Sequence, residues 1–264
     1  MTTPQDLLQL AVDIAQEAGS LAARRRAEGV HIADTKSAIA DIVTDADREV
    51  EALIRARLAA DRPGDGFLGE ESGEGRSQSG LTWVVDPIDG TVNYAYGIPA
   101  YAVSIAVVEG PAVPGEWTAL AGVVFNPVTG ERFQASRGGG AWLADRRLAV
   151  NDPVTPAGAL LATGFGYDPA THAGDLARLA KVMPLARDVR RIGAASLDLA
   201  SVAAGRLDGY FERGLHPWDH AAGALLVEEA GGLVGGFGGG PVGRAMTIAA
   251  GPDLYARLLA VITE

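Results

Sequence analysis

We read the fold outward from the stretch Trp83-Val84-Val85-Asp86-Pro87-Ile88-Asp89-Gly90-Thr91-Val92-Asn93-Tyr94, in which an apolar segment leads into two carboxylates and a Gly-Thr pair. Residues 82–85 are β-branched or aromatic, which predicts a buried strand. Asp86 and Asp89 follow where the chain is expected to leave the sheet, and open α/β sheets bind ligands at such strand ends. The carboxylates and the carbonyl of Ile88 suit a hard divalent cation, although the spacing alone is also compatible with a structural loop.

Length and composition limit the class of protein. The 264 residues are enough for one large domain or two closely packed ones, and the net charge of −11 argues against a general nucleic-acid-binding surface. Without cysteine, the chain has no disulfide, thiolate nucleophile or cysteine-bound zinc. The N-terminus lacks a basic segment followed by an apolar core, and no apolar run approaches a membrane span. We therefore predict a soluble, cytoplasmic protein without a membrane anchor.

The N-terminal half is expected to begin with helices and continue as an antiparallel sheet. Periodic apolar residues predict a helix over 6–28, and Thr44 or Asp45 can cap a second helix that runs to about residue 60. Strands are expected at 67–68, 101–109, 119–126 and 131–136. The polar, glycine-rich segment 73–80 is predicted to be a mobile loop.

Further acidic residues are candidates for the same site, but each also has a structural explanation. Asp47, near a helix start and close to Lys36, can orient water, although the helix dipole also favours an aspartate in a first turn. Glu70 and Glu71 follow a short strand and can add a third carboxylate beside the cation, or they form a solvated loop. Asp219 lies at the start of a helix, where an N-cap is the more common role.

The C-terminal half has a different pattern. Short apolar runs at 160–164, 189–192 and 210–211 alternate with helix candidates at 175–183 and 196–204, which predicts α/β structure. We expect a domain boundary between 143 and 156, and divide the chain into 1–145 (metal and phosphate binding) and 146–264 (substrate binding), packed as one globular unit. His216 and His220 do not suit a zinc pair, because Pro217 lies between them.

Three motifs occur together and in order: Gly69-Glu-Glu-Ser72, Asp86-Pro-Ile-Asp-Gly-Thr-x-Asn-Tyr94 and Trp218-Asp-x-Ala-Ala-Gly223. With this combination the chain resembles the inositol monophosphatases, and matches at 43–47 and 204–212 extend the resemblance over nearly the whole chain. The resemblance implies a layered αβαβα sandwich of the sugar-phosphatase type, with a mixed, largely antiparallel N-terminal sheet and a smaller C-terminal α/β sheet. It also implies a Mg²⁺-dependent phosphomonoesterase with two or three ions, usually a homodimer and often inhibited by lithium.

The resemblance further implies roles for individual residues. The Mg²⁺ ligands would be Glu70, Asp86, the Ile88 carbonyl, Asp89 and Asp219. The catalytic residues would be Glu70, Thr91 and Asp47, of which the last two would orient the attacking water, with Lys36 near the metal loop. Phosphate would be held by the N–H groups of Gly90 and Thr91, and substrate hydroxyls by Glu212 and backbone groups of Gly193, Ala194 and Ala195. Metal-activated water in an in-line displacement requires no covalent enzyme intermediate.

The chain departs from the family's pattern at the turn that faces the substrate. Ala194 stands where Ser or Thr is frequent and Ser196 where Ala is common, which predicts that the hydroxyl has moved along this turn. The implied substrate is inositol 1-phosphate, and histidinol phosphate, nucleotide 3′-phosphates and fructose bisphosphate are alternatives within the superfamily.

Two rival functions come from other classes. Phosphatases that form an aspartyl-phosphate also place Asp, Gly and Thr after a strand, but only one residue separates their two aspartates. Here Pro87 and Ile88 separate Asp86 from Asp89, which disfavours an aspartyl nucleophile. A regulatory binding protein that keeps the fold is the other rival, since some members of the resembling family also bind transcription machinery.

Overall fold

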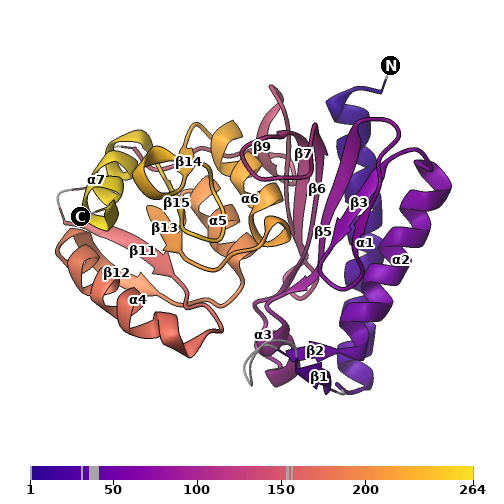
Figure 1. Cartoon of the computed structure of the whole chain (residues 1–264), viewed down its shortest axis with the longest axis horizontal. Helices are drawn as coiled ribbons and strands as arrows, with labels where there is room; N and C mark the ends of the chain where they lie inside the picture. The colour runs from indigo at the N-terminus through magenta and orange to yellow at the C-terminus, as the bar shows by residue number, and fades with distance from the viewer. Residues whose placement is uncertain (1, 31, 36–41, 153–154, 156, 264) are drawn as a thin grey trace.

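The computed structural model describes residues 2–30, 32–35, 42–152, 155 and 157–263. The helices are α1 (Pro4–Glu28), α2 (Asp45–Asp61), α3 (Thr91–Tyr96), α4 (Pro169–Val182), α5 (Ala195–Ala203), α6 (Pro217–Glu229) and α7 (Pro252–Thr263), with short 3₁₀ turns at 183–185 and 237–239. Helices and two sheets stack in five layers (Figure 1). Helices α1 and α2 cover the outer face of the first sheet, α5 and α6 lie between the sheets, and α7 and α4 cover the second sheet. This confirms the predicted αβαβα sandwich.

The first sheet is antiparallel except for one pair of strands. Its order is β10-β9-β8-β7-β6-β5-β3-β4, and only β3 and β5 run parallel. The strands are β3 (Gly66–Gly69), β4 (Gly73–Gly75), β5 (Leu81–Asp89), β6 (Ala102–Glu109), β7 (Thr118–Asn126), β8 (Glu131–Ser136), β9 (Gly140–Leu143) and β10 (Arg146–Arg147). The prediction of a loop over 73–80 is wrong for 73–75, which pair with β3 as an edge strand. A separate antiparallel pair, β1 (Ile32–Thr35) and β2 (Ile42–Thr44), precedes α2.

The second sheet is smaller, as predicted, and it combines parallel and antiparallel strand pairs. Its order is β12-β11-β13-β15-β14, with β11 parallel to both of its neighbours and β15 antiparallel to both of its own. The strands are β11 (Ala159–Thr163), β12 (Ala186–Arg190), β13 (Gly209–Glu212), β14 (Leu233–Gly235) and β15 (Thr247–Ala250). The division of the chain at residue 145 stays a prediction, because α5 and α6 pack against both sheets.

Both faces of the first sheet are buried, which explains why apolar residues make up most of its central strands. Successive side chains of a strand point to opposite faces, so Trp83 and Val85 enter the core beneath α1 and α2. Val84, between them, enters the core shared with α5 and α6. A sheet covered by helices on both sides has no face left for polar residues.

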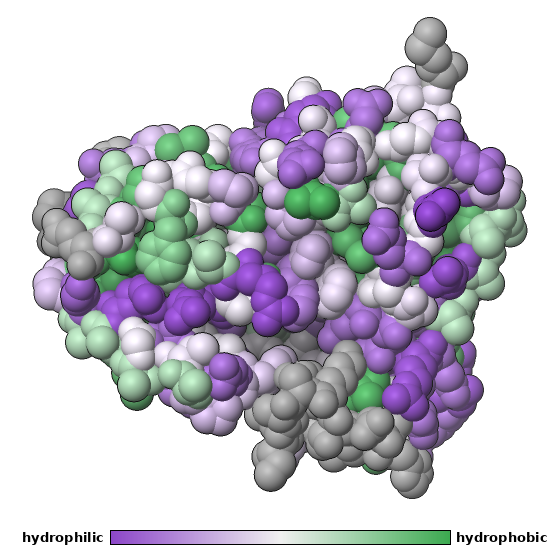
Figure 2. Space-filling model, in the orientation of Figure 1, coloured by the Kyte–Doolittle hydropathy of each residue, from purple (hydrophilic) through white to green (hydrophobic). Residues whose placement is uncertain are grey.

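The surface is more polar. On the face drawn in Figure 2, hydrophobic residues are scattered among hydrophilic ones. Among the helices of the described ranges, none combines the length and the apolar content that crossing a bilayer requires.

Strand β5 places the carboxylates of the opening stretch. We expected Asp86 and Asp89 in a turn after the strand, but β5 continues to Asp89, paired with β6 through a bulge between the two aspartates. Pairing with β3 on the other side ends at Val85. Pro87 has no N–H to donate to a ladder, so the bulge accommodates it. The carboxylates therefore lie where one neighbouring strand has ended and the other continues.

Candidate active site

Three carboxylates from two distant parts of the chain meet where β5 ends and α6 begins. Asp86 and Asp89 of β5 and Asp219 of α6 each offer an oxygen within 4.8 Å of the others. Burial raises the pKa of Asp86 well above its usual value, and the charges of Glu70, Asp89 and Asp219 raise it further. Burial also raises the pKa of Asp219 well above its usual value, and that of Asp89 as well. Buried carboxylates that repel one another are stabilised by a cation, and an all-oxygen donor set fits Mg²⁺.

Asp219 is not the N-cap that helix statistics favour. Helix α6 begins at Pro217, so His216 is the N-cap and Asp219 is the third helical residue. Proline is favoured at a first helical position, which fixes this start. One oxygen of Asp219 accepts a hydrogen bond from the backbone N–H of His216 at 2.6 Å. The aspartate therefore helps to close the helix start while it belongs to the acidic cluster.

Asp89 is held by the first turn of α5, more than 100 residues later in the sequence. One oxygen accepts from the N–H of Ala195 at 3.2 Å, and the other from the N–H and Oγ of Ser196 at 2.7 and 2.5 Å. Our expectation for Ser196 is therefore wrong: its hydroxyl does not lie along the substrate-facing turn but is fully buried against Asp89. The N–H of Ala195, predicted to contact substrate, also donates to Asp89.

The loop that carries Glu70 is fastened by a residue that the sequence reasoning missed. Glu51 of α2 is buried, and its carboxylate accepts from the N–H groups of Glu71 and Ser72 at 2.8 and 2.7 Å. A Cβ at Gly69 would come within 2.5 Å of Glu51, so a larger residue there would displace the Glu51 carboxylate. The loop brings Glu70 close enough to Asp86 to raise the pKa of that aspartate.

Asp47 and Thr91 meet beside this cluster. The Thr91 hydroxyl lies 3.2 Å from Asp47 Oδ1 and 3.1 Å from the Ile88 carbonyl oxygen. The other oxygen of Asp47 accepts from the N–H and hydroxyl of Thr44 at 2.7 and 2.5 Å, which confirms Thr44 as the cap of α2. Burial raises the pKa of Asp47 to about 7. Lys36, predicted near the metal loop, lies outside the described residues.

Asn93 connects the start of α3 to the predicted substrate turn. Its side-chain amide donates to the carbonyls of Ala100 and Ile192 at 2.8 and 2.9 Å, and lies 3.4 Å from that of Gly193. Gly90 caps α3 with a φ of 90°, and a Cβ there would come within 2.9 Å of the Ala100 carbonyl oxygen. Asn93 belongs to the quoted motif, but its position in that motif did not show this structural role.

Glu212, predicted to contact substrate hydroxyls, is not among the three clustered carboxylates. It accepts a hydrogen bond from the hydroxyl of Tyr210 at 2.6 Å, and burial raises its pKa to about 7. Arg191 opposes that rise, and it also lowers the pKa of Asp89, so its cationic group is close to both. Neither Tyr210 nor Arg191 was predicted; Arg191 directly precedes the predicted turn, whose Ala194 is buried.

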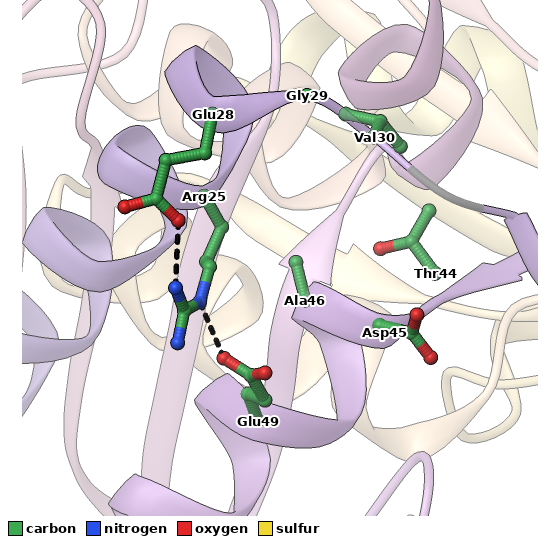
Figure 3. Close-up of a pocket in the computed structure, with 8 residues that line it drawn as sticks. All are labelled: Arg25, Glu28, Gly29, Val30, Thr44, Asp45, Ala46 and Glu49. Atoms are coloured by element: carbon green, nitrogen blue, oxygen red, sulfur yellow. Dashed lines mark hydrogen bonds and ion pairs between the residues drawn. The ribbon is translucent and has the colours of Figure 1, made fainter.

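A pocket of about 330 Å³ lies away from the cluster, between the end of α1 and the start of α2. Figure 3 shows Arg25 reaching between Glu28 and Glu49, with hydrogen bonds of 2.6 Å to each. The pocket shares only Thr44 with the groups described above. Two of its three acidic side chains, Glu28 and Glu49, are already paired with Arg25, so the chemistry of the site belongs with the clustered aspartates instead.

Comparisons with known proteins cover nearly the whole chain. The inositol monophosphatase family model matches residues 3–264. The inositol-1-monophosphatase of Mycobacterium leprae (strain TN) is 44% identical over 98% of this chain and 94% of that protein. The Nus factor SuhB of Escherichia coli (strain K12) is 42% identical over 89% of this chain and 86% of its own length. The crystal structure of extragenic suppressor protein suhB from Bartonella henselae superposes with a TM-score of 0.89 at 37% identity, over 98% of each chain.

Proposed function

The chain belongs to the inositol monophosphatase family, and from this premise we propose that it hydrolyses inositol 1-phosphate to inositol and phosphate with Mg²⁺ as cofactor. It is a phosphatase for small phosphomonoesters, as its relatives are. The observation that carries the proposal is the juxtaposition of three carboxylates, the buried Asp86 and Asp89 and the half-buried Asp219, with the Thr91–Asp47 pair. The proposal includes a homodimer and inhibition by lithium, which the family resemblance implies.

The metal ligands we propose are Glu70, Asp86, the Ile88 carbonyl, Asp89 and Asp219. The donor set is made of oxygens only, and the raised pKa values of the aspartates reflect a negative charge that a divalent cation compensates. When bound, two or three Mg²⁺ ions would lower the pKa of a water molecule and neutralise charge on the phosphate oxygens.

The chain's own residues would position the water and the phosphate. When the Thr91 hydroxyl donates a hydrogen bond to Asp47, the lone pairs of its Oγ remain free to accept a hydrogen bond from the attacking water. Asp47, with a pKa of about 7, can hold or release a proton near neutral pH. The N–H groups of Gly90 and Thr91 would donate to the phosphate. Glu212 and the Gly193 turn would contact the hydroxyls of the leaving alcohol.

A panel of phosphomonoesters tests the proposal. Purified protein with Mg²⁺ is given inositol 1-phosphate, histidinol phosphate, adenosine 3′,5′-bisphosphate and fructose 1,6-bisphosphate, and phosphate release is measured. We expect the highest kcat/KM with inositol 1-phosphate and no turnover with EDTA. A higher kcat/KM with another ester would change the proposed substrate but leave the proposed reaction intact. Activity that survives both EDTA and Asp89→Asn would overturn the metal mechanism.

A regulatory binding role is the second candidate, and the relative named Nus factor SuhB favours it. An exclusively binding role would not require the buried acidic cluster. Binding to transcription machinery that needs no Mg²⁺ and is unchanged by Asp89→Asn, in a protein that releases no phosphate, would favour this candidate over catalysis.

A further inference from the structure

Glu212 is confined on several sides. The Tyr210 hydroxyl donates to Glu212 Oε2 at 2.6 Å, and the Tyr210 side chain is fully buried, so it has no freedom to move away. The backbone of Gly164 passes so close that a Cβ there would lie 1.9 to 2.2 Å from the Glu212 carboxylate. Only glycine at 164 leaves the carboxylate in its observed place.

A further side of Glu212 is bounded by α4. A cavity of about 10 Å³ adjoins Glu212 and is lined in part by Asp175, Arg178 and Arg213. Such a volume is about that of one water molecule, so the Glu212 side chain cannot swing into it. Asp175 is paired with Arg178 at 2.9 Å and lies 3.7 Å from Arg213, which keeps this wall in place.

The hydrogen bond from Tyr210 also commits one of the two carboxylate oxygens. Within the part of the chain that the structure describes, Tyr210 is the hydrogen-bond partner found for Glu212. A carboxylate has about four lone-pair positions, so Oε1 keeps its capacity to accept a hydroxyl from a ligand. The Tyr210 hydroxyl and Gly164, rather than Glu212 itself, set the direction in which Oε1 can accept a hydrogen bond.

We propose that Tyr210 and Gly164 are positioning residues that fix Glu212 and thereby set the preference of the enzyme for polyol phosphates over phosphate esters without a neighbouring hydroxyl. This inference rests on the proposed phosphatase function. It concerns the alcohol half of the substrate only, because Glu212 is not among the three aspartates that cluster at the metal site.

The test compares two substrates in two variants. Tyr210→Phe keeps the ring and removes the hydroxyl, and Gly164→Ala pushes on the carboxylate. A hydrogen bond to a charged group contributes enough to predict about a 10-fold loss of kcat/KM for inositol 1-phosphate, mainly through KM. For 4-nitrophenyl phosphate, whose leaving group has no further hydroxyl, we expect a change of less than about 2-fold by the same reasoning.

Matched controls separate positioning from general damage. Gly174→Ala, in α4, places its Cβ in open space, and Tyr255→Phe removes a phenol from the remote helix α7. Both substitutions should leave kcat/KM for the two substrates unchanged. Tyr210→Phe should cause no further loss of kcat/KM for inositol 1-phosphate in a Glu212→Gln background, because the effects of residues that act through one another are not additive. Thermal unfolding of each variant records any loss of stability.

The outcomes are distinguishable. If the unaltered protein with Mg²⁺ hydrolyses neither ester, the proposed function fails and this inference fails with it. If it hydrolyses both esters, but Tyr210→Phe and Gly164→Ala lower kcat/KM equally for the two esters or change it for neither, only this inference is overturned. Additive losses in the double variant with Glu212→Gln would overturn it as well.

Discussion

Helices α1 and α2 begin with the same local arrangement, a threonine N-cap and an aspartate as the third helical residue. Asp6 accepts from the N–H and hydroxyl of Thr3 at 2.8 and 2.7 Å, and Asp47 accepts from those of Thr44 at 2.7 and 2.5 Å. Yet these bonds lower the pKa of the exposed Asp6, whereas burial raises that of Asp47 to about 7. Identical local chemistry thus gives a helix cap in one case and a group ready for proton transfer in the other.

The start of α6 adds a third aspartate at the same helical position. Asp219 accepts from the N–H of His216 at 2.6 Å, as Asp6 and Asp47 accept from their caps. An oxygen of Asp219, however, lies in the cluster with Asp86 and Asp89. What distinguishes the three aspartates is the tertiary surroundings of their carboxylates.

The largest expected effect comes from removing the charge of that third aspartate. Asp219→Asn keeps an oxygen for the His216 N–H but removes a proposed metal ligand, so we expect phosphate release to fall by several orders of magnitude. Metal-free stability should not fall, because the repulsion with Asp86 and Asp89 is relieved. Asp6→Asn is the matched control and should keep full activity. Near-normal turnover by Asp219→Asn would contradict the metal assignment.

The second effect separates Asp47 from Asp6 directly. Asp47→Asn keeps the size of the side chain but cannot exchange a proton, and we expect a loss of about 10²- to 10⁴-fold in kcat, the usual contribution of acid–base catalysis. The same change at Asp6 should leave kcat unaltered. Single-turnover phosphate release with saturating Mg²⁺ measures both. Equal activity in the two variants would show that Asp47 acts only as a cap.

The comparison also shows what the sequence can and cannot predict. A second helix to about residue 60, capped by Thr44 or Asp45, and the central strands followed from local patterns; the structure confirms the helix and the strands and shows Thr44 as the cap. These features depend on residues a few positions apart. The contact between Asp47 and Thr91 joins residues 44 positions apart, so only the resemblance to a known family could suggest it.

The misses have the same physical origin. Glu51 lies on a helix that also carries Arg48, Glu49 and Arg55, where a glutamate is ordinarily exposed. It is nevertheless buried and binds the loop of Glu71 and Ser72. Ser196 was expected to face substrate, yet the packing of α5 against β5 turns its hydroxyl to Asp89. In each case a tertiary contact more than 19 residues away decides the role.

A third prediction concerns the stability of the metal-free protein between about pH 8 and 6.5. The pKa values of Asp47 and Glu212 are raised to about 7 in the folded state, so folding takes up protons as the pH falls. The penalty of burying these charges is fully present above that value and is released on acidification. Stability should therefore rise, by up to about 1.4 kcal/mol per pH unit for each group.

Thermal unfolding in EDTA at several pH values measures how stability changes with pH. Asp47→Asn should flatten this dependence and Asp6→Asn should not, since the pKa of Asp6 is lowered rather than raised. Below about pH 6.5 the buried His220 works in the opposite direction, because its pKa is lowered to about 4 and the unfolded chain then takes up the proton. Stability that falls steadily as the pH is lowered from 8 to 6.5 would contradict the predicted rise.

The smallest expected effect is the loss of the caps themselves. Thr3→Ala removes the hydroxyl partner of Asp6 and should cost about 1 kcal/mol of unfolding free energy, with kcat unchanged. Thr44→Ala removes the equivalent hydrogen bond, but it also leaves the buried Asp47 with one donor fewer, so it should cost more and lower kcat as well. Urea unfolding measures the stability of the two alanine variants, and phosphate release measures their activity. Serine in place of threonine at either position should restore stability and activity. If the two alanine variants lose the same stability and keep the same activity, the Thr44 hydroxyl serves the helix start alone, and the difference between the two aspartates lies entirely on the side that faces Thr91.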